Sequence, residues 1–67
     1  MCPDVIALTE SSIACLERCR TRMVVSINLM ERSGRDTSSA ERLLTMIERN
    51  LVGLHVRLRA LVQVRSA

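Results

Sequence analysis

Apolar residues recur at alternating spacings of four and three along the second half of the chain. A helix with this spacing presents one continuous apolar seam, which packs against another helix. The series consists of Ala40, Leu44, Ile47, Leu51, Leu54, Leu58 and Leu61. The first half carries a less regular series of the same kind, made of Ile6, Thr9, Ile13, Leu16, Arg20, Met23, Ile27 and Met30. The pattern therefore predicts two amphipathic helices.

Helix-ending and helix-starting residues separate the two series. Gly34 suits the left-handed conformation that follows many helix ends. Ser38 with Glu41 fits a capping box, although Asp36 or Thr37 could equally cap the second helix. Pro3 and Asp4 suit the opening of the first helix.

These signals predict an all-α fold, an antiparallel two-helix hairpin. The helices are expected at about 4–33 and 38–64, with a loop at about 34–37. The 67 residues form one domain, and so short a connection forces the helices to pack as neighbours.

A two-helix hairpin leaves one side of each seam uncovered. At 48% apolar residues the chain is too apolar for disorder, yet two helices alone bury little surface. Further apolar residues lie outside the seam: Val24, Val25, Leu29, Met46, Val52, Val56 and Val64. We therefore expect a homodimer that forms a four-helix bundle, a higher homo-oligomer, or docking on another helical protein.

One stretch of the chain resembles a known pattern. Residues 31–44 read ERSGRDTSSAERLL, and Leu51 and His55 follow. This resembles the pattern E-R-x-G-x-D-T-x-x-A-x-x-L-L, L-x-x-x-H of small, uncharacterised alphaproteobacterial proteins of rhizobial type. That pattern ends in R-x-x-L, an element that corresponds here either to residues 57–58 or to residues 59–62. The resemblance covers about Glu31–Leu61 and implies a hairpin without implying a function; the family's charged first helix differs from the cysteine- and methionine-containing one here.

Arg20 is the one charged residue in the predicted seam. With Glu17 one turn away and Glu48 on the paired helix, it is a candidate for setting the helix register or binding an anion. The simpler interpretation is a long side chain that extends past the seam edge into solvent.

The three cysteines are expected to be free thiols in a reducing cytoplasm, because their number is odd and no signal peptide is expected. Cys15 and Cys19 share a helical face, and His55 lies at the same height on the other helix. They could hold Zn²⁺ or Cu⁺ together, but the spacing differs from the usual zinc motifs, so no metal or other cofactor is expected. His55 is more simply an edge residue that faces Glu17.

The pattern predicts no enzyme, since it contains no catalytic constellation. A non-enzymatic interaction or oligomerisation module is favoured. A Rop-like hairpin dimer that binds RNA is the first alternative, because the chain has ten arginines and a net charge of +3. The arginines are nevertheless spread over both helices among acidic residues, and aromatic residues for base stacking are absent. The second alternative is a small secretion-type chaperone or a regulatory adaptor. No segment is apolar enough to span a membrane.

Overall fold

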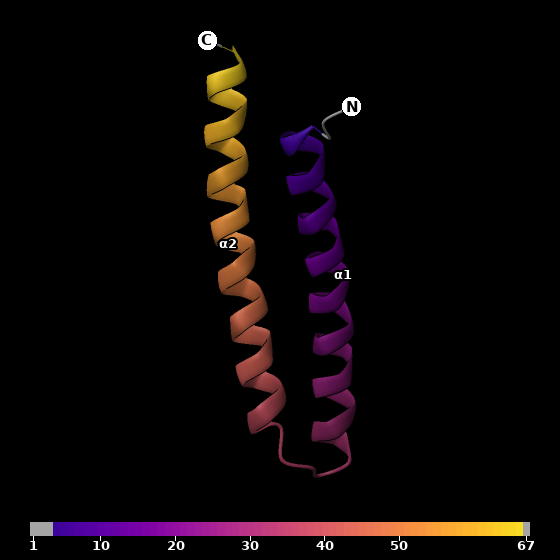
Figure 1. The fold of residues 1–67 in the computed structure, drawn as a ribbon. Helices are drawn as coiled ribbons and strands as arrows, with labels where there is room; N and C mark the ends of the chain where they lie inside the picture. Colours follow the sequence, from indigo (N-terminus) through magenta and orange to yellow (C-terminus); the bar gives the residue numbers. More distant parts are fainter. Residues whose placement is uncertain (1–3, 67) are drawn as a thin grey trace.

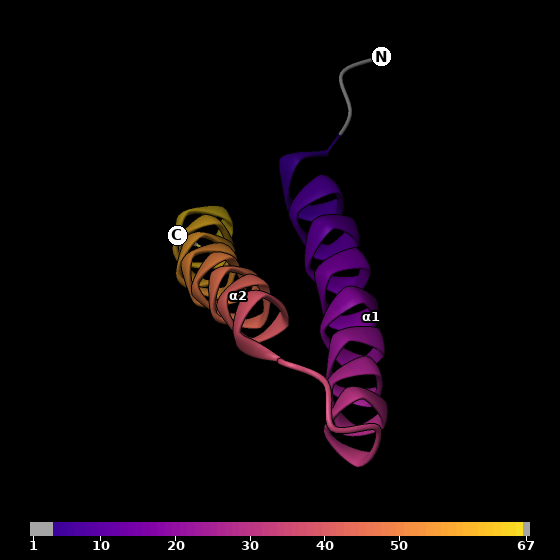
Figure 2. The ribbon, with the colours of Figure 1, turned by 90° about the horizontal axis from the view of Figure 1, so that it is seen from below.

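The protein is an antiparallel helical hairpin. A computed structural model describes residues 4–66, in which α1 comprises Val5–Arg32 and α2 comprises Ser38–Ser66. The two helices lie side by side, with the connection at one end and both termini at the other (Figure 1). Seen from below, the two helices lie beside each other and are inclined to one another (Figure 2). The predicted hairpin is confirmed, and α2 extends two residues beyond its expected end. Pro3 lies outside the described residues.

Asp4 begins α1 and also joins the two ends of the hairpin. Its carboxylate accepts a hydrogen bond from the backbone N–H of Ile6 at 3.0 Å, which satisfies one of the free donors of the first helical turn. The other carboxylate oxygen of Asp4 lies 3.1 Å from Nη1 of Arg65 in the last turn of α2. A carboxylate at one helix start is thereby paired with a cation at the neighbouring helix end, as the helix dipoles favour.

A Schellman motif ends α1. Gly34 adopts the left-handed conformation with φ of 73°, which an L side chain rarely adopts. The N–H of Gly34 donates to the carbonyl of Glu31 at 3.1 Å, and the N–H of Arg35 donates to the carbonyl of Met30 at 2.9 Å. These two bonds satisfy carbonyls that have no partner within the helix, so the sequence signal at Gly34 has a direct physical cause.

The start of α2 differs from the Ser38–Glu41 capping box. Oδ1 of Asp36 accepts both the N–H and the hydroxyl of Ser38, at 3.0 and 2.7 Å. The N–H of Glu41 donates to the carbonyl of Thr37 at 2.9 Å. Ser38 already lies inside the helix, and its hydroxyl acts as a donor. Asp36 therefore supplies the capping acceptor, a choice that the sequence left open among Asp36, Thr37 and Ser38.

The same contacts predict a pH effect. The hydrogen bonds from the Ser38 hydroxyl and backbone lower the pKa of Asp36 below its ordinary value of 3.8. A carboxyl group whose pKa is lower in the folded than in the unfolded chain stabilises the fold at pH values above its pKa in the unfolded chain. This contribution is lost as the pH falls through its pKa in the folded chain. In an NMR titration of Ser38→Ala, the pKa of Asp36 should rise towards 3.8, because the hydroxyl makes the largest contribution. An unchanged pKa would contradict the assigned cause.

The seam residues form a thin core. Only three apolar residues among those described are buried: Ile13 and Ile27 at 7% exposure and Leu51 at 8%. Thr9 is also buried, and its hydroxyl donates to the carbonyl of Val5 at 2.8 Å. The remaining apolar seam residues are partly covered: Ile6, Leu16, Met23, Met30, Ala40, Leu44, Ile47, Leu54, Leu58 and Leu61. Two helices therefore shield the seam from one direction only.

Candidate interaction surfaces

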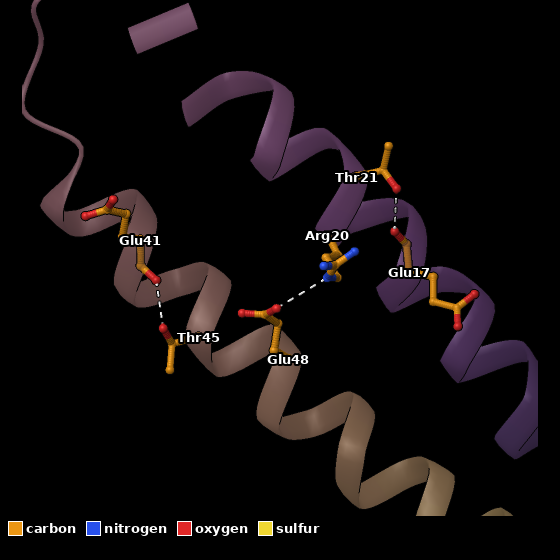
Figure 3. Close-up of polar contacts among 6 residues, drawn as sticks. All are labelled: Glu17, Arg20, Thr21, Glu41, Thr45 and Glu48. Carbon is orange, nitrogen blue, oxygen red and sulfur yellow. Dashed lines mark hydrogen bonds and ion pairs between the residues drawn. The ribbon is translucent and has the colours of Figure 1, made fainter. Parts of the chain in front are cut away.

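Arg20 occupies a seam position, but its guanidinium lies outside the seam. The side chain is 48% exposed, and its Nε lies 3.4 Å from Oε2 of Glu48 on α2. Figure 3 shows Arg20 turned towards Glu48 across the two helices. A half-exposed pair of this kind contributes about 0.2–1 kcal/mol. The length of the arginine side chain thus keeps its charge in water while its aliphatic part crosses the seam edge.

Glu17 pairs with His55 and not with Arg20. Nε2 of His55 lies 3.8 Å from Oε1 of Glu17, and both side chains are more than half exposed. Within residues 4–66, this contact and the ion pairs of Arg20 with Glu48 and of Asp4 with Arg65 connect the two halves of the hairpin along its length.

The two described cysteines and His55 do not form one cluster. Cys15 and Cys19 are exposed free thiols. They lie at heptad positions that flank the opposite side of the seam from His55 and its partner Glu17. Within residues 4–66, no three His, Cys, Asp or Glu side chains are grouped closely enough to hold a metal ion. Cys2 lies outside the described residues.

All glutamates of the chain lie on one broad face of the hairpin. With the seam residues at heptad positions a and d, every glutamate falls at position e, which flanks the same side of the seam on both helices. The pair of Glu17 with His55, both at e, and the contact of Arg20 with Glu48 lie on this side. We call it the glutamate face, defined by Glu10, Glu17, Glu31, Glu41, Glu48 and His55.

The opposite broad face carries no acidic side chain. It consists of positions c and g, and we call it the glutamate-free face. Its residues are Val5, Leu8, Ser12, Cys15, Cys19, Arg22, Ser26 and Leu29 on α1 and Leu43, Met46, Asn50, Gly53, Arg57, Ala60 and Val64 on α2. A shallow groove of about 420 Å³ runs between the helices here. Ser12, Asn50, Gly53 and Arg57 line it together with the seam residues Leu16 and Leu54 and with Arg49 from the outer edge of α2. The groove brings Ser12 at position g of α1 to the same side as Asn50 and Arg57 at position g and Gly53 at position c of α2.

The exposed large apolar residues gather mainly on the glutamate-free face. Six of the ten lie there: Val5, Leu8, Leu29, Leu43, Met46 and Val64. The other four, Val25, Val52, Val56 and Val62, are distributed over the outer edges and the glutamate face. The off-seam apolar residues expected from the sequence include some of these positions but not Val5, Leu8 and Leu43. Assigning each residue its heptad letter would have found them, because it separates position g from position e.

A second hollow lies on α1 alone. It has about 480 Å³ and is lined by Ala14, Glu17, Arg18, Thr21 and Arg22. All five residues come from α1, so no second element contributes a group to it. Within residues 4–66, no helix combines the length and apolar composition needed to cross a bilayer.

No protein-family model, curated protein or solved structure matches this chain.

Proposed function

We propose that the hairpin is a non-enzymatic protein–protein interaction module that assembles with itself into a four-helix bundle. The observation that supports this most strongly is the thin core: only Ile13, Ile27 and Leu51 are buried apolar residues among those described, and no side chain is fully buried. Chains of this size rarely reach useful stability from so little burial. Association supplies the missing apolar contacts.

The distribution of apolar residues supports the same proposal. A helix that contacts one partner needs a seam of a and d positions, whereas a helix inside a bundle needs a wider stripe that adds e or g. Here the stripe widens on the g side, where Val5, Leu43 and Val64 lie, while the e side carries the glutamates. The sequence thus widens the apolar surface more on the g side than on the e side, where Val24 and Val62 are the apolar residues.

Thermal unfolding at several protein concentrations tests this proposal. If folding is coupled to association, mass action requires the melting temperature to rise with concentration. We expect circular dichroism to show this rise between micromolar and millimolar chain. A melting temperature that stays constant over that range, with helicity fully retained, would contradict self-association.

A further inference from the structure

We propose that the glutamate-free face is where a second copy of this chain docks, face to face. This inference rests on the proposed self-assembly and adds which surface forms the contact. The glutamate face is thereby assigned to solvent.

The apolar residues of the glutamate-free face form two clusters, one at each end of the hairpin. Leu29, Leu43 and Met46 lie near the connection, and Val5, Leu8 and Val64 lie near the termini. A two-fold axis can relate two such faces with their connections at the same end or at opposite ends. In both cases each apolar cluster meets an apolar cluster of the other copy, so the face is complementary to itself.

Small side chains lie at mid-height on the face, between the levels of Arg57 and Arg22. Cys15 and Cys19 lie there on α1 and Gly53 lies there on α2, where a Cβ added to Gly53 would meet nothing within 4 Å. Small residues at a helix crossing let two backbones approach closely. A glycine in a helix interior costs about 1 kcal/mol relative to alanine, and a close approach of the second copy gives this glycine a structural role.

The charged side chains of the face are all arginines. Arg22 and Arg57 lie on it at different heights along the hairpin, and Arg49 lines its groove. With the connections at opposite ends, Arg22 lies level with Cys15 of the second copy and Arg57 with its Met46. With the connections at the same end, Arg22 lies level with the stretch of α2 that holds Met46 and Arg49, and Arg57 lies level with Ser12. Arg22 and Arg57 face neither themselves nor each other in either arrangement. Stacking this face on the glutamate face of another copy would place arginines opposite glutamates, but such a head-to-tail contact forms an open series and not a closed dimer.

The available area is sufficient for a stable dimer. The hairpin measures 52 × 21 × 13 Å, and the two broad faces are those of 52 by 21 Å. A face of that size exceeds the roughly 800 Å² per partner that specific interfaces bury. The seam residues Leu16 and Leu54, which are partly exposed beside the groove, would be covered as well.

Two matched substitutions test the choice of face. Met46 and Val52 are both on α2 and exposed to similar extents, 58% and 64%, but they lie on opposite faces. Met46→Glu should weaken the dimer at least about tenfold, because a carboxylate would be buried without a partner. Val52→Glu should change the dissociation constant by less than about twofold, as for other surface changes. Equal effects of the two substitutions in sedimentation equilibrium would overturn the proposal.

Thiol reactivity provides an independent readout in the unaltered fold. Cys15 and Cys19 are exposed in the single hairpin and would be covered in the dimer. In a Cys2→Ser background, their rate of reaction with Ellman's reagent should fall as the chain concentration passes through the dissociation constant. The matched control carries Ala14→Cys with all three natural cysteines replaced by serine. Because Ala14 lies next to Glu17 and Thr21 on the other side of the helix, its rate should stay constant.

The outcomes separate the two proposals. A chain that is monomeric at every concentration overturns the proposed function. A chain that is dimeric, while Cys15 and Cys19 keep their full reactivity, overturns the docking face alone. An open series of larger species would show head-to-tail stacking and would also overturn the face-to-face arrangement.

Discussion

Replacing Leu51 with alanine is expected to lower the free energy of unfolding by about 2–5 kcal/mol. Leu51 is the one apolar residue of α2 that is buried in the hairpin, at 8% exposure, and it lies midway along the seam. Truncation removes apolar contacts with α1 and leaves a cavity that two long helices cannot easily close. Chemical denaturation monitored by circular dichroism at fixed chain concentration measures the change.

The neighbouring residue provides the control for Leu51→Ala. Val52 is 64% exposed, so Val52→Ala should change stability by no more than about 0.5 kcal/mol. If the two variants unfold at the same denaturant concentration, Leu51 does not lie in the core. Leu54, which the seam pattern groups with Leu51, is only partly covered in the hairpin. Leu54→Ala should therefore lower the free energy of unfolding most at chain concentrations at which the dimer is populated.

Replacing Arg20 with leucine is expected to raise the free energy of unfolding by about 1–2 kcal/mol. The pair of Arg20 with Glu48 spans 3.4 Å between half-exposed groups and contributes at most about 1 kcal/mol. A leucine between Ile13 and Ile27 would extend the apolar seam, and burying one leucine contributes about 1.5–3 kcal/mol. The gain from burial therefore exceeds the loss of the pair. Thermal and denaturant unfolding both measure the difference.

The same substitution is expected to affect the assembly. A polar residue in a seam limits which registers and oligomers form, so Arg20→Leu should give a mixture of species where the natural chain gives one. Glu48→Gln is the control, because it removes the ion pair and leaves the seam unchanged. Marked destabilisation by Arg20→Leu would contradict this account and would show that Arg20 anchors a network that needs its charge.

The sequence was sufficient to predict the hairpin because its signals are local and agree with one another. The heptad spacing of residues such as Leu44 and Leu51 fixes which side of each helix is apolar, and Gly34 marks the one position where the backbone must turn left-handed. The capping group of α2 could not be chosen this way, since Asp36, Thr37 and Ser38 all offer acceptor oxygens. Only the backbone path shows that Asp36 is the acceptor.

The interaction surface was harder to predict, because it depends on which side of the seam each residue flanks. Off-seam apolar residues such as Met46 and Val52 look equivalent in the sequence, yet they lie on opposite faces of the hairpin. The sequence favoured an Arg20 side chain that extends past the seam edge, but because this long side chain has several staggered conformations, the spacing could not choose between Glu17 and Glu48 as its partner. What covers the glutamate-free face is not encoded in one chain's local pattern, because it depends on a second molecule.

Sedimentation equilibrium of the natural chain under reducing conditions tests the central claim of self-assembly most directly. A single hairpin has a mass of 7.5 kDa. We expect the weight-average mass to rise with concentration and to level off at twice that value, the mass of a four-helix bundle. A mass that stays at 7.5 kDa up to millimolar concentration, with the helices intact, would contradict the account.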